Sequence, residues 1–271
     1  MTVVSHPMQR EEEWWAVRDF LVETFPIAPP GHVWDTRRWD GHRFHRAEPS
    51  HPPWTGRTRL WREDGRIVGV AHQEGSRDLA IQIHPDRRHL EDEMVAWAEK
   101  VLAAEMPEGR VLEVPVFDYD LVRRRVLHDR GYEATDDGEV IRRMRLGDAD
   151  HPAQELDGGY RIRTARAGDP VDAKVFAELL NDSFGRTFHQ EAEVFAFRTG
   201  SPSYREDLDL MAEAPDGTLA ASVGVTIDEV NRAGTFEPVL THPGHRRRGL
   251  ALALMREGLH RMKAAGVETA W

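Results

Sequence analysis

The clearest pattern of apolar and polar positions lies near the end of the chain. An apolar strand is expected over residues 235–241, and the His-Pro-Gly sequence at 242–244 predicts a tight turn after it. Apolar residues with the spacing of one helix face then follow, namely Leu252, Met255, Leu259 and Met262. Gly266 predicts the end of that helix. The expected order is therefore strand, loop and helix.

The loop between this strand and this helix is basic. Residues 246–248 are all arginine, and Gly249 opens the helix. The first N–H groups of a helix have no internal partner, glycine allows a ligand to approach closely, and arginine binds phosphate oxygens. The pattern therefore predicts a phosphate site. It is not a P-loop, because Gly244-x4-Gly249 is followed by Leu250-Ala251 and not by Lys-Ser/Thr.

The sequence Arg246-x-x-Gly249-x-Ala251 resembles motif A of the GNAT N-acetyltransferases, which is written Arg/Gln-x-x-Gly-x-Gly/Ala. The resemblance implies that the amides of residues 246–251 hold the pyrophosphate of acetyl-CoA, and that residues 239–241 pair with its pantetheine arm. The cofactor-binding residues implied in this way are Val239, Leu240, Thr241, Arg246, Arg247, Arg248, Gly249, Leu250 and Ala251. Acetyl-CoA is the implied co-substrate, and no metal is expected. The alternative is an ordinary surface helix with a basic first turn.

The same resemblance implies direct attack of an amine on the thioester, a reaction that needs a base. Glu237 is the only carboxylate on the strand, and it lies two residues before Val239, so it is expected on the same face as Val239. Glu237 is therefore the candidate base, and a structural role beside Pro238 is the alternative. The tyrosine that usually acts as general acid in the family has no counterpart before the chain ends at Trp271.

The two halves of the chain have similar series of expected elements. For the first half these are a helix at 12–25, a hairpin about Asp64-Gly65, a strand at 78–84, a helix at 90–104, a strand at 111–117, a helix at 120–129 and a hairpin at 132–145. For the second half they are a strand at 160–164, helices at 169–184 and 188–198, a hairpin about Asp216-Gly217, the motif, and the start of a strand at 267–271.

Aligning the halves at their His-Pro sequences, residues 84–85 and 242–243, indicates a duplication in which the first copy has changed. Glu91 then stands where the second half has Gly249, and Asp92 and Glu93 follow it. Carboxylates at a helix N-terminus interact favourably with the helix dipole, at the position that a pyrophosphate would otherwise use. The first half is therefore expected to keep the fold without binding CoA, as in tandem GNAT proteins with one degenerate half.

The expected fold is α/β, with two tandem GNAT-like domains that each have a mixed central sheet flanked by helices. The degenerate domain is expected over residues 1–147, a linker over 148–159, and the domain with the acetyl-CoA motif over 160–271. The second domain is expected to lack its last strands and to leave an exposed sheet edge.

Composition narrows the classes of function. The net charge of −11 argues against nucleic-acid binding, and no apolar run is long enough to cross a membrane. The absence of cysteine excludes a thiolate nucleophile and cysteine-bound zinc. The N-terminus lacks the apolar core of a signal peptide, so a cytoplasmic location is expected. The expected partner is a small-molecule or peptide amine, and the protein is expected to be a monomer or a homodimer.

Residues 27–58 show no clear period. The spacing of His42, His45 and His51 could suggest a metal site, but solvated or capping histidines are the preferred interpretation, because carboxylates at a known ligand spacing are lacking. Trp34, Trp39 and Trp54 could line an acceptor pocket. For the whole chain, N-acetyl transfer to an unidentified amine is the leading hypothesis. The alternatives are a non-catalytic CoA-binding sensor or scaffold protein, and an interaction domain without a CoA site.

Overall fold

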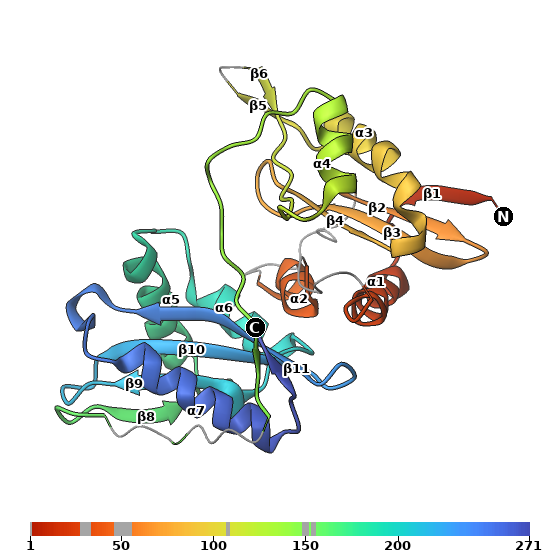
Figure 1. Cartoon of the computed structure of the whole chain (residues 1–271). Coiled ribbons are helices and arrows are strands. Elements are labelled where there is room, and N and C mark those ends of the chain that lie inside the picture. The colour runs from red at the N-terminus through yellow and green to blue at the C-terminus, as the bar shows by residue number, and fades with distance from the viewer. Residues whose placement is uncertain (1, 28–33, 46–55, 107–108, 148–151, 153–155) are drawn as a thin grey trace. The chain divides into compact units, whose positions relative to one another are not determined.

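A computed structural model of the chain describes residues 2–27, 34–45, 56–106, 109–147, 152 and 156–271. The chain divides into two units, residues 1–39 with 50–139 and residues 40–49 with 140–271 (Figure 1). Residues 40–49 and 140–147 therefore join the second unit, whereas the sequence analysis assigned them to the first domain. Most of the expected linker lies outside the described residues.

The first unit is built on an antiparallel sheet in the order β1-β2-β3-β4. Its strands are β1 (Val3–Pro7), β2 (Thr58–Glu63), β3 (Arg66–Gln73) and β4 (Leu79–Ile83), with a separate pair β5 (Ala104–Met106) and β6 (Gly109–Val111). Its helices are α1 (Glu11–Thr24), α3 (Glu91–Val101), α4 (Leu121–Asp129) and the first residues of α2 (Thr36–Phe44).

The second unit contains a mixed sheet in the order β7-β12-β11-β10-β9-β8, in which only β11 and β12 are parallel. The strands are β7 (Met144–Arg145), β8 (Arg161–Thr164), β9 (Asp209–Glu213), β10 (Leu219–Asp228), β11 (Ala233–Thr241) and β12 (Thr269–Ala270). The helices are α5 (Pro170–Phe184), α6 (Glu191–Gly200) and α7 (Leu250–Ala264).

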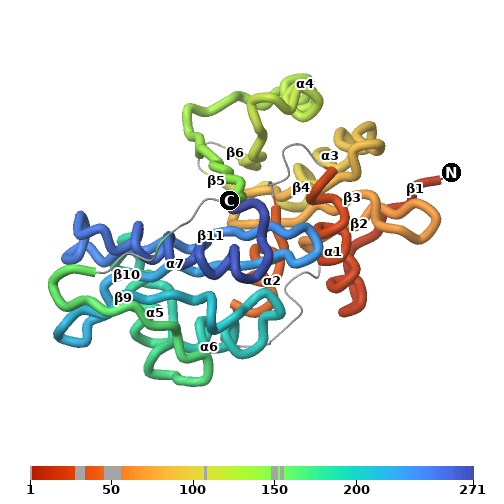
Figure 2. The backbone as a smooth tube through the Cα atoms, turned by 60° about the horizontal axis from the view of Figure 1, so that its bottom comes forward, coloured from red at the N-terminus to blue at the C-terminus, as the bar shows by residue number. Residues whose placement is uncertain are grey.

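The helices of the second unit cover opposite faces of its sheet (Figures 1 and 2). One core cluster joins α7 to Val223 and Val225 of β10, and another joins α5 and α6 to Met211 and Leu240. Alternation along each strand sends successive side chains to these two cores. Helix α7 therefore packs on one face of the sheet, and α5 and α6 pack on the other.

The two units share a topology, as the duplicated sequence pattern predicts. Strands β1 to β4 follow the same order as β8 to β11, and a parallel partner comes next in both, as the Asp78–Glu113 bridge and as β12. In each unit the connection after the fourth strand begins with a histidine whose Nδ1 accepts an N–H two residues on, at 3.3 Å for His84 and 3.1 Å for His242. The expected α/β fold class is confirmed.

Three expectations about strands are wrong. The hairpin expected at 132–145 is absent from these described residues, which contain only β7. The strand expected at 111–117 is reduced to the end of β6 and the single bridge at Glu113. The sheet edge expected to be exposed is covered, because β7 pairs antiparallel with β12. A short strand from the end of the first half thus completes the second sheet.

The helices lie close to where periodicity places them, but their buried faces are rotated. On α1 the exposed side chain is Trp15, at 42% exposure, while Trp14 and Val17 are fully buried. On α7, Leu252 is half exposed, and Gly258 packs against the sheet instead. A Cβ on Gly258 would lie 2.6 Å from the Phe236 ring. Small residues therefore define a close helix–sheet contact that an apolar count overlooks.

Candidate functional site

The loop between β11 and α7 has a backbone shape suited to an anion. After the short 3₁₀ helix Pro243–His245, Arg247 has a φ of 62° and Gly249 has a φ of 76°. These two left-handed residues turn the chain so that α7 begins at Leu250. Glycine reaches this conformation without the steric cost that a side chain adds. The glycine predicted to admit a ligand is therefore also required by the turn.

The main-chain amides of this loop are available. The first hydrogen bond of α7 runs from the Ala253 N–H to the Gly249 carbonyl, at 3.0 Å. Within the described residues, the amides from Arg246 to Leu252 donate to no protein acceptor. They lie at the positive end of a helix of 15 residues. Helix dipole, free amides and arginines together favour a phosphate or diphosphate.

The loop is held in place by residues that the sequence analysis did not identify. The Arg246 guanidinium donates to the Ser183 carbonyl at 3.0 Å, at the end of α5, and to the Thr241 carbonyl at 3.4 Å. The Tyr160 hydroxyl and the His245 Nδ1 are 2.8 Å apart. Arg246 thus supports the loop structurally, while Arg247 and Arg248 are exposed. Apart from the His-Pro turn, no sequence signal indicates these contacts.

The far end of β11 presents an open edge. The His242 N–H donates to the Ala220 carbonyl at 2.9 Å, so the alternation of an antiparallel ladder directs the Leu240 amide toward β10. The amides and carbonyls of Val239 and Thr241 point the other way. On that side β12 pairs only with Ala233 and Gly234 among the described residues. An extended, amide-containing ligand arm would find main-chain partners there.

A bulge interrupts β11 at the candidate base. The partners of Val223 and Val225 on β11 are Val239 and Phe236, so two residues of β11, Glu237 and Pro238, lie opposite the single residue Gly224 of β10. A Cβ on Gly224 of β10 would lie only 2.6 Å from the Glu237 carbonyl oxygen. Simple alternation therefore fails here, and the argument that placed Glu237 on the face of Val239 is wrong. Its role as base stays a prediction.

Replacing Gly224 by alanine tests whether this bulge supports the site. The added methyl meets backbone, which cannot move aside cheaply, so we expect a loss of about 1–3 kcal/mol in unfolding free energy. Weaker binding of acetyl-CoA should accompany it. Urea denaturation and calorimetry measure the two effects. Gly69→Ala is the control, because its Cβ meets mainly the flexible end of Met94; equal effects in both variants would count against a special role for the bulge.

The corresponding position in the first unit is closed. There the 3₁₀ helix Pro85–Leu90 runs directly into α3, and Leu90 has a φ of −81°, so no left-handed turn precedes the helix. Glu91 is fully buried and accepts hydrogen bonds from Arg123 and, at 2.7 Å, from Arg88. The first unit thus has a buried, arginine-bound carboxylate at the position that aligns with Gly249 of the second unit.

A second carboxylate completes this closure. Asp120 accepts from Arg88 at 2.7 Å and from the Arg123 amide at 3.1 Å, at the start of α4. Burial acts to raise the pKa of Asp120, but the Arg88 and Arg123 contacts outweigh it and hold that pKa below its usual value. The carboxylate therefore stays ionised and paired. This arrangement leaves the two arginines engaged with protein side chains.

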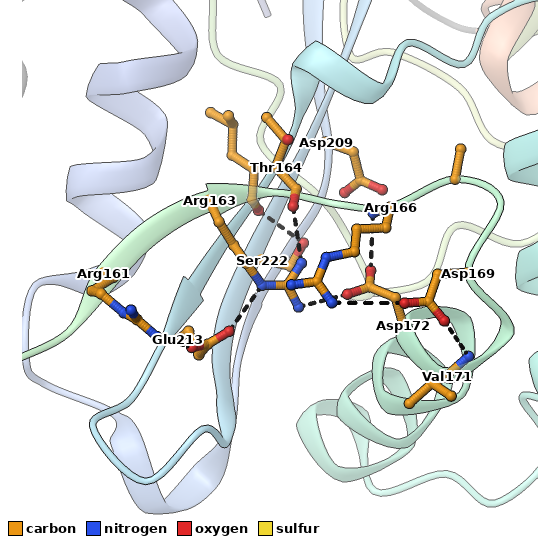
Figure 3. A network of polar contacts seen from close by, with 12 residues as sticks. Arg161, Arg163, Thr164, Arg166, Asp169, Val171, Asp172, Asp209, Glu213 and Ser222 are labelled. Atoms are coloured by element: carbon orange, nitrogen blue, oxygen red, sulfur yellow. Dashed lines mark hydrogen bonds and ion pairs between the residues drawn. The ribbon is translucent and has the colours of Figure 1, made fainter.

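A buried ion network fixes α5 and α6 to the sheet of the second unit, and Figure 3 shows the part of it around Arg163 and Asp172. Arg163 of β8 binds Asp172 at 2.6 Å, and Arg198 of α6 binds Asp172 and Asp209, each at 3.1 Å. Burial raises the pKa of Asp209. Asp209 is the register partner of Gly224. The network therefore braces the sheet at the level of the bulge.

Trp34 and Trp39, two of the three tryptophans suggested to line a pocket, lie in the core. Trp34 and Trp39 are 3% and 0% exposed and contact each other's rings at 5.2 Å. His51 and Trp54 lie outside the described residues. Among the residues that the structure describes, no group of three histidine, cysteine, aspartate or glutamate side chains could hold a metal ion.

Comparisons with known proteins agree with this geometry. Residues 174–271 match the sequence model of the Acetyltransferase (GNAT) family. A GCN5-related N-acetyltransferase from Sphaerobacter thermophilus is 19% identical, with a TM-score of 0.62 over 99% of this chain and 85% of its own. A tandem GNAT protein from the clavulanic acid biosynthesis pathway is 17% identical, with a TM-score of 0.59 over 99% and 89%. No curated protein sequence matches the chain.

Residues 174–271 thus match the GNAT family, and the whole chain has the fold of a solved tandem GNAT protein. Both findings agree with the GNAT resemblance and the tandem arrangement expected from the sequence. In the described part of the chain, no helix is long and apolar enough to cross a membrane.

Proposed function

We propose that the second unit transfers the acetyl group of acetyl-CoA to the primary amine of a small-molecule or peptide acceptor. The pyrophosphate binds the amides of residues 246–251 with Arg247 and Arg248, and the pantetheine arm lies along residues 239–241. The observation that carries this proposal is the loop after β11, where two left-handed residues present free amides at the start of α7.

The reaction follows from this placement. The Val239 N–H, which points away from β10, donates to the thioester carbonyl oxygen and stabilises the oxyanion that forms on attack. Glu237 takes a proton from the attacking ammonium, directly or through water. The carbon–sulfur bond of the tetrahedral intermediate then breaks, leaving an N-acetylated product and the CoA thiolate, which takes up a proton.

Glu237→Gln tests the assignment of the base. Because general-base catalysis contributes about a hundredfold to ten-thousandfold, we expect kcat to fall by that order while the Kd for acetyl-CoA stays unchanged. Steady-state kinetics with an amine that the parent protein acetylates give kcat, and calorimetry gives the Kd for acetyl-CoA. Glu229→Gln, at an exposed glutamate in the β10–β11 turn, is the matched control. An unchanged kcat in Glu237→Gln would assign Glu237 to structure instead.

Turnover separates transfer from the alternative of a sensor or scaffold protein. We expect the parent protein to acetylate an amine, and we expect a variant with a disrupted cofactor site to lose this activity. Tight binding of acetyl-CoA without acetylation of any amine would favour the non-catalytic alternative.

A further inference from the structure

The connection between α5 and α6 is a preorganised loop. Gly185, with a φ of 63°, ends α5, and the Arg186 N–H then bonds the Asn181 carbonyl at 2.8 Å. The Asn181 carboxamide closes the loop by donating to the His189 carbonyl and accepting from the His189 N–H, both at 3.1 Å. A loop fixed by its own hydrogen bonds presents its side chains at little entropic cost on binding.

This loop presents an arginine between two exposed aromatic rings. The Arg186 guanidinium lies 4.8 Å from the Phe184 ring centre and 5.6 Å from that of Phe188, and the two rings are 49% and 61% exposed. Among the described residues, no carboxylate lies within ion-pair distance of Arg186. Arg163, Arg198 and Arg205 of the same unit do form ion pairs, and the chain as a whole is acidic.

The chemistry of this arrangement favours a small anion attached to an apolar group. Stacking on aromatic rings orients the guanidinium plane while its N–H groups stay available at the edge, where they bind a carboxylate or phosphate with two hydrogen bonds. The exposed ring surfaces on either side can contact the carbon skeleton of the same ligand.

The loop lies beside the proposed cofactor site. Ser183, immediately before Phe184, accepts the hydrogen bond from Arg246 of the phosphate loop. The α5–α6 connection belongs to the sheet face opposite α7, as the two core clusters show. A cofactor seated at the start of α7 and along the open edge of β11 therefore leaves the α5–α6 side for the second substrate.

We infer that Arg186, stacked between Phe184 and Phe188, binds a carboxylate of the acceptor and so selects amines that carry one. The inference rests on the proposed transfer to an amine and names the class of acceptor. The 3′-phosphate of CoA offers the same chemistry from another source, and the experiment distinguishes the two.

The test uses the full chain with acetyl-CoA and amines supplied in matched pairs. Each pair is a free amino acid and its carboxamide, with L-phenylalanine, L-leucine, L-lysine and the dipeptide Gly-Phe as the carboxylate members, and products are measured by mass spectrometry. The variants are Arg186→Gln, Arg186→Lys and, as an exposed control in another loop, Arg166→Gln. Calorimetry with acetyl-CoA and 3′-dephospho-acetyl-CoA forms the second arm.

The parent is expected to acetylate a carboxylate member in preference to its carboxamide. Arg186→Gln should lower kcat/KM for the carboxylate member about tenfold to a hundredfold, largely through a higher KM. The same variant should leave kcat/KM for the carboxamide member unchanged. Arg186→Lys should restore part of the loss, and Arg166→Gln should match the parent.

Three outcomes would overturn the inference. Equal acetylation of both members of every pair, or equal effects of Arg186→Gln on both, would show that no carboxylate is selected. If the parent bound acetyl-CoA more tightly than its 3′-dephospho form and Arg186→Gln abolished this difference, the anion that Arg186 binds would be the 3′-phosphate of the cofactor. No product from any pair, with acetyl-CoA bound, would contradict amine transfer itself as well as this selectivity.

Discussion

A chain carrying Gly249→Glu is expected to bind acetyl-CoA about a thousandfold more weakly than the parent. A carboxylate about 4 Å from a phosphate costs about 4 kcal/mol at an effective dielectric constant near 20, and each 1.4 kcal/mol changes Kd about tenfold. The substitution reproduces in the second unit the residue that occupies the aligned position in the first, Glu91. Isothermal calorimetry measures the change directly.

The control for this variant has to share its backbone strain. Gly217→Glu serves, because Gly217 has a φ of 87°, has no heavy atom within 4 Å of a Cβ, and lies in the β9–β10 turn. Both variants carry the same added charge and the same left-handed glutamate, so their stabilities should fall alike. If Gly217→Glu weakened acetyl-CoA binding as much as Gly249→Glu, the loss would reflect damage to the fold and not to a phosphate site.

The second large effect concerns stability. Arg198→Ala is expected to lower the free energy of unfolding by about 3–5 kcal/mol, because it leaves the buried Asp172 and Asp209 without this cation. It also removes the guanidinium from the Phe176 ring, 4.7 Å away. Urea denaturation measures the loss, and Arg205→Ala, at a 40% exposed ion pair with Asp207, should cost less than about 1 kcal/mol. Similar losses in both variants would contradict the importance ascribed to the buried network.

The sequence was most informative where local chemistry determines local structure. The Asp-Gly turns, the helix ends and the His-Pro caps depend on residues that lie next to one another, and their positions are close to those observed. The glycine and the arginines of the phosphate loop are likewise contiguous. The second unit, the cofactor class and the altered first half could therefore be predicted from a short motif and one internal alignment.

Contacts between distant segments were not predictable in this way. The pairing of β7 with β12 joins residues 144–145 to 269–270, and although a strand was expected in each segment, nothing in either sequence indicates that the two pair. The bulge at Glu237 depends on Gly224 across the ladder, so counting along β11 alone gave the wrong face. The helix α2 lies in a segment without apolar periodicity, and its course is set by packing, as the buried Trp39 shows. The strand pairing, the bulge and the helix all depend on contacts between segments that are distant in the sequence.

The stoichiometry of acetyl-CoA binding to the full chain tests the central claim most directly. One site per chain is the predicted result, because the loop before α7 offers free amides, whereas Glu91 and Asp120 engage the arginines at the corresponding place in the first unit. Two sites of similar affinity would contradict the assignment of the first unit as closed. Absence of binding would contradict the phosphate site itself.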